Sequence, residues 1–184
     1  MEEELTVTPP GVKLIEDFVN TLELDEADGE HLVDPRALGE WLSERDLLPA
    51  GASLGEDDLD RARGVREAVR KLLLANNGAP LDPDAVATLN AAADESHLRV
   101  VFSPTGVADL VPDQSDVPGA LARILAVAYT AMADESWPRL KACRLDDCQW
   151  AFYDQSKNRS RTWCSMKVCG NRAKARAYRE RQRS

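Results

Sequence analysis

The chain has 184 residues, of which 43% are hydrophobic and 30% are charged, a composition suited to a folded core with a solvated surface. This length accommodates one ordinary domain with a small addition. No stretch approaches the roughly 18 consecutive apolar residues that a membrane-spanning helix needs. The first residues, MEEELTVTPPG, hold no apolar segment of signal-peptide length. We therefore expect a cytoplasmic protein whose cysteines stay reduced.

Charge is divided unevenly along the chain. Residues 139–184 contain 13 Lys/Arg and 4 Asp/Glu, a net charge of +9. Because the whole chain has 23 Lys/Arg and 32 Asp/Glu, residues 1–138 keep 10 basic and 28 acidic residues, a net charge of -18. This asymmetry indicates a basic module for a polyanion joined to an acidic domain with another task. DNA would repel the acidic domain; alternatively, that domain folds back on the basic module and masks it.

Helical patterns fill the first half of the chain. Asp34-Pro35 and Asp82-Pro83 each combine an N-cap residue with proline at the first helical position, which predicts two helix starts. The longest pattern opens with acidic residues and stops at Asn77-Gly78. The predicted helices cover residues 12–24, 35–45, 56–78 and 83–94.

The period of the pattern changes after the fourth predicted helix. The runs LRVVFS and VADLVP flank Pro-Thr-Gly at 104–106, which predicts a two-stranded hairpin. An alanine-rich helix over residues 117–134 is apolar on most sides and is expected to be central. Trp137-Pro138 breaks it. We predict a mainly α (α+β) fold, with a mostly helical domain over residues 1–138 and a small module over residues 139–184.

The last 42 residues hold all four cysteines: Cys143, Cys148, Cys164 and Cys169. Each close pair can turn two thiolates toward one point, and the longer spacer can run out and back as a hairpin. Four soft ligands favour one tetrahedral Zn²⁺ in a closed structural site. Disulfides are disfavoured in a reducing compartment, and the spacings match neither ferredoxin pattern. Trp150, Phe152 and Trp163 are expected to form a miniature core rather than to stack on bases.

Residues 167–183 are predicted to form a basic helix, in which alanines alternate with cations. By itself this segment could be a solvated terminal helix. Anchored to zinc through Cys169, it is typical of an element that binds phosphates or enters a groove. Asn171 and Arg172 are the predicted base readers, although either could instead cap the helix or pair internally. The predicted phosphate contacts are Arg159, Arg161, Lys167, Lys174, Arg176, Arg179 and Arg181.

The segment CRLDDCQWAFYDQSKNRSRTWCSMKVCGNRAKARAYRER resembles the CGNR zinc-finger family, named for the tetrapeptide at residues 169–172. The resemblance covers about residues 139–182. Upstream, DFVNT at residues 17–21 and the helix that contains Trp41 resemble the ABATE domain that commonly precedes this finger. The resemblance implies a bacterial, stress-related transcription regulator whose zinc finger binds DNA, with the four cysteines as zinc ligands.

The predicted function is a zinc-dependent, DNA-binding transcription regulator whose N-terminal domain senses a ligand or partner. A homodimer would add specificity to so small an interface. Asn20 and Thr21 could line a small-molecule pocket, although polar residues in helices commonly bond local backbone. The sequence holds no Ser/His/Asp arrangement, phosphate-cradling glycine loop or carboxylate–histidine metal motif that would favour an enzyme. The alternatives are a zinc-stabilised module for RNA or an acidic protein, and a thiol-based redox sensor.

Overall fold

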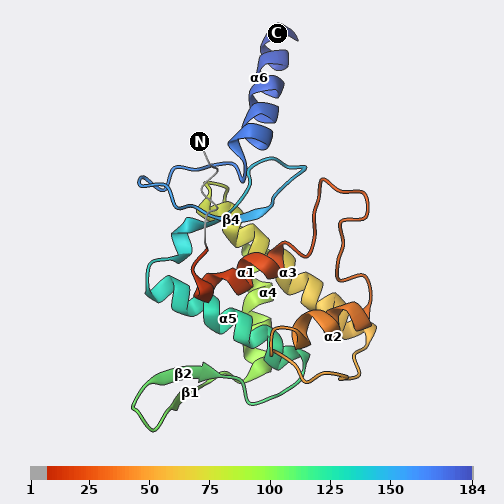
Figure 1. Ribbon diagram of the computed structural model, residues 1–184, viewed down its shortest axis with the longest axis vertical. Helices are drawn as coiled ribbons and strands as arrows, with labels where there is room; N and C mark the ends of the chain where they lie inside the picture. The colour runs from red at the N-terminus through yellow and green to blue at the C-terminus, as the bar shows by residue number, and fades with distance from the viewer. Residues whose placement is uncertain (1–7, 184) are drawn as a thin grey trace.

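In the computed structural model, which describes residues 8–183, helices dominate and the strands form two short pairs (Figure 1). In chain order the elements are α1 (Pro10–Val19), α2 (Pro35–Ser43), α3 (Glu56–Asn76), α4 (Pro83–Ser96), β1 (Arg99–Phe102), β2 (Ala108–Val111), α5 (Val117–Ala133), the 3-10 turn η1 (Trp137–Arg139), β3 (Leu140–Ala142), β4 (Ala151–Tyr153), the π-helical turn η2 (Met166–Gly170) and α6 (Asn171–Arg183). The predicted fold class is confirmed. Within residues 8–183, no helix is long and apolar enough to span a membrane.

The helix starts follow the capping signals of the sequence. The Asp34 carboxylate accepts a hydrogen bond from the Ala37 amide at 2.7 Å, and Asp116 accepts one from Gly119 at 3.0 Å. The first helix, by contrast, ends at Val19, five residues before its predicted end. The chain turns there because the Thr21 hydroxyl donates to the Phe18 carbonyl and the Asn20 side chain is drawn toward β4.

The main apolar core lies among α1, α3, α4 and α5. Phe18, Leu73, Leu121 and Ile124 are fully buried in it. Helix α5 packs against both α1 and α4, and α3 packs along α4. The central position predicted for the alanine-rich helix is therefore confirmed, since its small side chains let neighbouring helices approach closely.

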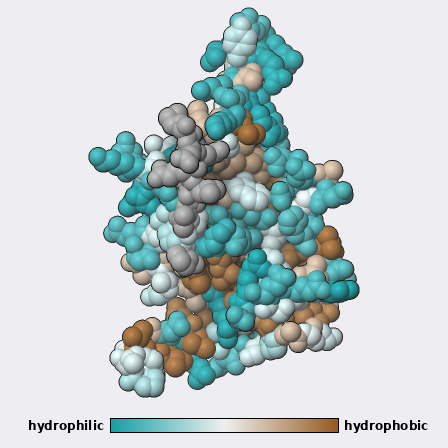
Figure 2. Space-filling view, viewed as in Figure 1, coloured by the Kyte–Doolittle hydropathy of each residue, from teal (hydrophilic) through white to brown (hydrophobic). Residues whose placement is uncertain are grey.

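The predicted hairpin is also present. β1 and β2 pair antiparallel, with Arg99 opposite Val111 and Phe102 opposite Ala108. The hairpin projects from the helical body (Figure 1), and its apolar side chains give a hydrophobic patch at that end of the molecule (Figure 2). Gly106 occupies the left-handed region at φ +81°, as a tight turn between strands requires.

The C-terminal module is fused to this body by apolar packing. β3 lies against α3, and Leu140, Ala142 and Ala151 are fully buried within the main core. The core thus runs across the predicted boundary at Trp137-Pro138. The strand pairing also differs from the prediction: β3 and β4 enclose the first cysteine pair, whereas the spacer between the pairs contributes only β4 and then a loop.

Asparagines at the end of α3 bind the backbone of the C-terminal module. The side-chain Nδ2 of Asn77 donates to the carbonyls of Ala142 and Thr162, each at 2.8 Å. Asn76 donates in the same way to Trp137 and Leu140, each at 2.9 Å. The bonds to Leu140 and Ala142 satisfy carbonyls of β3, and those to Trp137 and Thr162 tie the flanking segments to α3.

We predict that Asn77→Ala lowers the free energy of unfolding by about 2 kcal/mol, because it removes two hydrogen bonds, one of them to the carbonyl of the buried Ala142. The measurement is urea unfolding of the zinc-loaded chain. Asn90→Ala, at an exposed position of α4, is the matched control and should change stability by less than about 0.5 kcal/mol. Equal stabilities of the two variants would contradict the role assigned to Asn77.

Candidate metal centre

The four cysteine sulfur atoms converge on one point, all within 4.8 Å of one another. Cys164 Sγ lies 3.6 Å from Cys148 Sγ and 3.5 Å from Cys169 Sγ. A tetrahedral zinc with Zn–S bonds of about 2.3 Å requires sulfurs about 3.8 Å apart. The donor set therefore fits one structural zinc ion, and four protein ligands leave no position for a catalytic water.

Local backbone geometry delivers each sulfur to this point. Cys143 follows β3, and its amide donates to the Trp150 carbonyl at 2.9 Å, which closes the turn around the first pair. Cys169 lies in η2, where the next residue must be small: a Cβ atom on Gly170 would come within 2.6 Å of Met166 Sδ and 3.3 Å of the Trp163 ring. Gly170 thus lets the turn pack closely beside the sulfur cluster.

Crowding of the thiols has a strong effect on their ionisation. Hydrogen bonds from Cys148 and Cys164 lower the pKa of Cys143 to about 2, whereas the bond to Cys143 raises the pKa of Cys148 to about 12. The pKa of Cys164 is also raised, by hydrogen bonds to the same neighbours. Four thiolates can share this space only if a cation offsets their charge, which is what a divalent metal supplies.

Apolar side chains surround the sulfurs. Phe152 and Leu145 are buried with the cysteines, and Trp150, Trp163 and Ala173 pack half-buried around them. The predicted miniature core is confirmed.

Arg161, predicted as a phosphate contact, is instead directed into the module. Its Nε donates to the Trp163 carbonyl at 3.0 Å and its Nη2 donates to the Cys164 carbonyl. The guanidinium also lies over the Phe152 ring, 5.1 Å from its centroid. This arginine fixes the loop that carries a cysteine ligand.

A buried ion pair shapes the loop over residues 155–162. Lys141 Nζ lies 2.7 Å from Asp154 Oδ2 and also donates to the Arg159 carbonyl at 2.6 Å. Asp154 is fully buried and accepts the amides of Ser156 and Arg161, each at 2.9 Å. Burial alone would raise the pKa of Asp154, but Lys141 and these amides lower it below its ordinary value.

Sequence reasoning missed this pair. The sequence feature that could have predicted it is Lys141, which lies between the apolar residues Leu140 and Ala142. A lysine buried in such a strand requires a partner of opposite charge. The ion pair holds the loop in one shape, and this loop carries Lys157 and Arg159. Both of these side chains are exposed, as the predicted phosphate contact at Arg159 requires.

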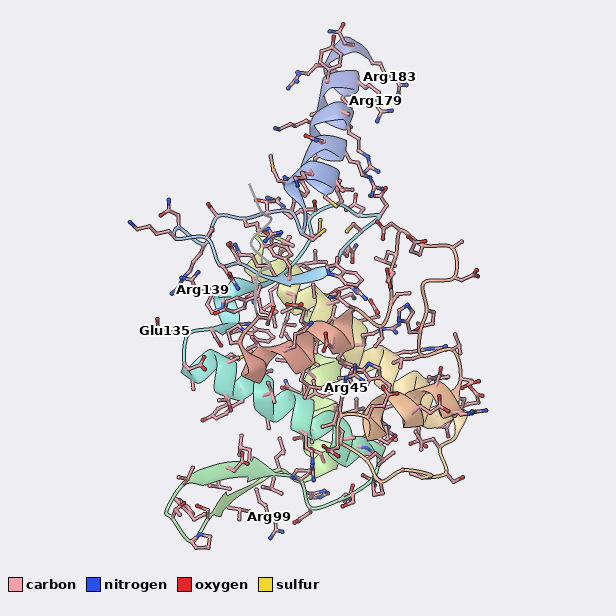
Figure 3. The ribbon with its side chains drawn as sticks, viewed as in Figure 1. Arg45, Arg99, Glu135, Arg139, Arg179 and Arg183 are labelled. Atoms are coloured by element: carbon pink, nitrogen blue, oxygen red, sulfur yellow. The ribbon has the colours of Figure 1, made fainter. Side chains whose placement is uncertain are left out.

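Helix α6 leaves the metal centre and extends away from the body (Figure 1), and its surface is strongly hydrophilic (Figure 2). Every residue of α6 is at least partly exposed. Its α-helical part begins at Asn171, because residues 166–170 form the wider, π-helical turn η2 and not the continuous helix predicted from Lys167. Arg179 and Arg183 project from the same side of the helix (Figure 3).

The predicted contacts on α6 fall into two groups. Asn171 Nδ2 donates to the Lys167 carbonyl at 2.8 Å, Arg172 lies 2.5 Å from Asp147, and Arg176 lies 2.7 Å from the same carboxylate. These residues contact protein groups. The remaining predicted contacts, Lys167 in η2 and Lys174, Arg179 and Arg181 on α6, are exposed, as Asn171 and Arg176 also are, and Arg179 Nε donates to the Ala175 carbonyl at 3.3 Å.

Asn20 and Thr21, the suggested pocket residues, contact other parts of the protein. Asn20 exchanges two hydrogen bonds with the Ala151 backbone, at 3.0 and 2.7 Å. Thr21 accepts from Arg66 Nη1 at 3.2 Å. The nearby Arg70, almost fully buried, donates to the carbonyls of Val19 and Gln149. Asn20 and Arg70 therefore join α1 and α3 to the cysteine module, a role that the sequence signal left open.

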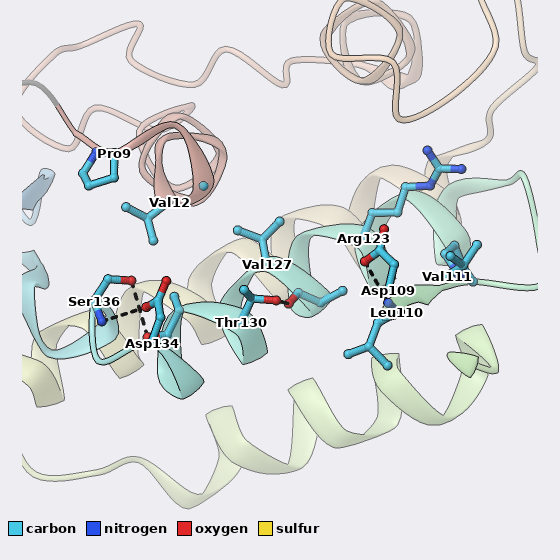
Figure 4. A pocket seen from close by; sticks show the side chains of 14 residues that line it. Pro9, Val12, Asp109, Leu110, Val111, Arg123, Val127, Thr130, Asp134 and Ser136 are labelled. Atoms are coloured by element: carbon cyan, nitrogen blue, oxygen red, sulfur yellow. Dashed lines mark hydrogen bonds between the residues drawn. The ribbon is translucent and has the colours of Figure 1, made fainter. Parts of the chain in front are cut away.

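A cavity of about 600 Å³ lies elsewhere, between the start of α1, β2 and α5 (Figure 4). Val12, Leu110 and Val127 give it an apolar wall, and Arg123 and Asp134 lie at its rim. Neither Asn20 nor Thr21 lines it.

We predict that the purified chain binds one zinc ion and that a strong chelator lowers its thermal midpoint by about 10 °C, since about 4 kcal/mol of ligand stabilisation is lost. The loss affects the whole chain because β3 and β4 share the main core. Metal analysis and thermal unfolding measure these two quantities. Cys164→Ser should unfold at the chelated midpoint with or without chelator. An unchanged wild-type midpoint after complete metal removal would contradict the prediction.

Asp154→Asn is predicted to lower the free energy of unfolding by about 3 kcal/mol, because it leaves the Lys141 ammonium buried without its counter-charge. The loss should be equal at pH 6 and pH 8. The lowered pKa keeps folded Asp154 ionised there, and its contribution disappears only when the pH falls through that lowered pKa. Denaturant unfolding at both pH values tests this, with exposed Asp60→Asn as the control.

Comparison with known families agrees with this geometry. The model of the CGNR zinc finger matches residues 139–182, the segment that holds the four cysteines and α6. The ABATE model, described as "Putative stress-induced transcription regulator", matches residues 13–135. A comparison with curated proteins finds no match. Because the ABATE match covers more than half of the chain, the chain belongs to the ABATE family, and a CGNR zinc finger follows its ABATE domain.

Proposed function

We propose that this protein is a zinc-dependent, DNA-binding transcription regulator in which the zinc finger contacts DNA and the ABATE domain receives a signal. The observation that carries the proposal is α6, a basic helix that extends into solvent from a rigid metal centre. A helix that serves only to close a core would bury one apolar stripe, and α6 buries none.

The distribution of charge supports a polyanionic partner. The exposed cations of α6 lie beyond the acidic body, at the end of the molecule opposite the apolar hairpin (Figures 1 and 2). A second set, Lys157 and Arg159, lies on the loop held by Lys141 and Asp154, which projects to the other side of the finger from the acidic loop of residues 23–30 (Figure 1). A helix and a fixed loop can contact groove and backbone together.

The cavity beside α5 is the proposed site for the signal. Its apolar wall and charged rim suit a small amphipathic molecule. α1 contributes to this cavity and, through Asn20, bonds to β4 of the finger. A ligand that shifted α1 would therefore act on the strand beside the zinc ligands.

The test is salt-dependent binding of the zinc-loaded protein to genomic DNA fragments, with sequencing of those retained above physiological salt. We expect enrichment of a defined motif, which is lost after zinc chelation or when the chain ends at Arg176. Six to ten phosphate contacts would reduce the affinity about 10³–10⁵-fold between 50 and 200 mM salt. Arg99→Ala, at the far end of the molecule (Figure 3), is the control and should bind as the wild type does.

Retention of all fragments without a motif, abolished by moderate salt, would contradict sequence-specific regulation and indicate a general polyanion binder. Competition with structured RNA then separates the RNA-binding alternative from DNA binding, because both partners present phosphates but differ in helix shape and in the 2′-hydroxyl groups of RNA.

A further inference from the structure

The environment of Arg172 indicates a role other than base reading. Its guanidinium lies 2.5 Å from Asp147 Oδ2 and 3.5 Å from Asp25 Oδ2. Asp147 directly precedes the ligand Cys148, and Asp25 belongs to the acidic loop of the ABATE domain. One side chain of α6 therefore contacts both the zinc-binding turn and the N-terminal domain.

Arg172 also lies in the field of the metal centre. Desolvation lowers its pKa, but the negative charges of Asp147 and Cys169 outweigh this effect and raise the pKa above its ordinary value. Zinc bound by four thiolates carries a net charge of -2, so a fixed cation beside the cluster stabilises it.

The Asp147 side chain is 40% exposed, but its two carboxylate oxygens differ in their surroundings. Its Oδ2 accepts Arg172 and, one helical turn later, Arg176 at 2.7 Å. Its Oδ1 is buried and has no hydrogen-bond partner among the described residues, so the carboxylate depends on these two guanidiniums for compensation.

The other residues of the tetrapeptide at 169–172 have internal roles as well. Cys169 provides a sulfur, Gly170 admits the Trp163 ring and Met166, and Asn171 binds the Lys167 carbonyl. Cys169 and Gly170 are buried, and the Asn171 side chain, although exposed, uses its Nδ2 in this local backbone bond.

The periodicity of α6 places a different set of side chains outward. At 3.6 residues per turn, Lys174, Tyr178 and Arg181 share one side of the helix, roughly opposite to Arg172 and Arg176. All three are exposed. At the base of α6, the side with Arg172 faces Asp25 and Asp147, whose carboxylates repel phosphate, and farther out the same side carries Arg179 and Arg183. The opposite side combines two cations with an aromatic ring along the helix.

Building on the proposed function, we infer that Arg172 is a positioning residue, which with Asp147 and Asp25 forms a clasp that fixes the direction of α6 on the zinc centre, and that the nucleic acid contacts the Lys174–Tyr178–Arg181 face. The phosphate-binding cations and the Tyr178 ring then lie where a backbone and a base or sugar can be engaged together.

The clasp is tested with Asp147→Asn and Arg172→Ala, singly and combined, and with the exposed neighbour Asp146→Asn as control. The readouts are zinc transfer to a chromophoric chelator and amide hydrogen exchange in α6. We expect zinc transfer about ten-fold faster in each clasp variant, and faster exchange in the first two turns of α6. The double variant should be less impaired than the sum of the single effects, because both variants remove the Arg172–Asp147 contact; Asp147→Asn also removes Arg176–Asp147, and Arg172→Ala also removes Arg172–Asp25. Asp146→Asn should match the wild type.

The contact face is tested through the salt dependence of duplex DNA binding. Lys174→Ala combined with Arg181→Ala should make the slope of log affinity against log salt less negative by about 2, with unchanged zinc transfer. Arg172→Ala should weaken binding without changing this slope.

Opposite results would overturn the inference. If Arg172 read DNA and Asp147 only competed for it, Asp147→Asn would tighten DNA binding and leave zinc transfer unchanged. If the wild type bound no DNA at all, the proposed function and the contact face would both fail. The zinc-transfer and exchange experiments would still decide the clasp, because they need no nucleic acid.

Discussion

Convergence of four sulfur atoms within 4.8 Å is the constraint on which the C-terminal module depends. Two sulfurs come from the turn between β3 and β4, one from a loop and one from η2. A single cation therefore fixes three backbone segments that have few other reasons to meet, and it sets where α6 begins. The short strands and half-buried tryptophans could not hold this arrangement alone, because so small a module buries too little apolar surface.

The same module is also part of the ABATE domain's core. Leu140, Ala142 and Ala151 are buried against the helices, and Asn20, Arg70 and Asn77 bond to the finger's backbone. Polar bonds of this kind need accurate geometry, so a displacement of α1 or α3 would strain the strands that carry the cysteines. The metal centre and the helical body are thus joined by direct contacts, through which the signal proposed for the ABATE domain would reach α6.

Opposite charges meet at one defined place between the acidic body and the basic helix. The acidic domain does not cover α6 as a whole, because every residue of that helix remains at least partly exposed. Contact is made by Asp25 and Asp147 with arginines at the base of the helix. The rest of the basic helix extends outward, beyond the carboxylates that would compete with a polyanion for its basic side chains.

The sequence by itself determined the elements whose signals are local: the capped helix starts, the hairpin, the central alanine-rich helix and the four zinc ligands. Cap residues, hydrophobic period and cysteine spacing act over a few residues, so they can be interpreted without a fold. The tertiary structure decided which polar side chains are used internally. Arg161 binds carbonyls beside a zinc ligand, Arg172 binds two carboxylates, and Lys141 is buried with Asp154. In the sequence these cations look alike, because charge is a property of one residue, whereas the direction of a side chain and the partner it meets depend on how the chain folds around it.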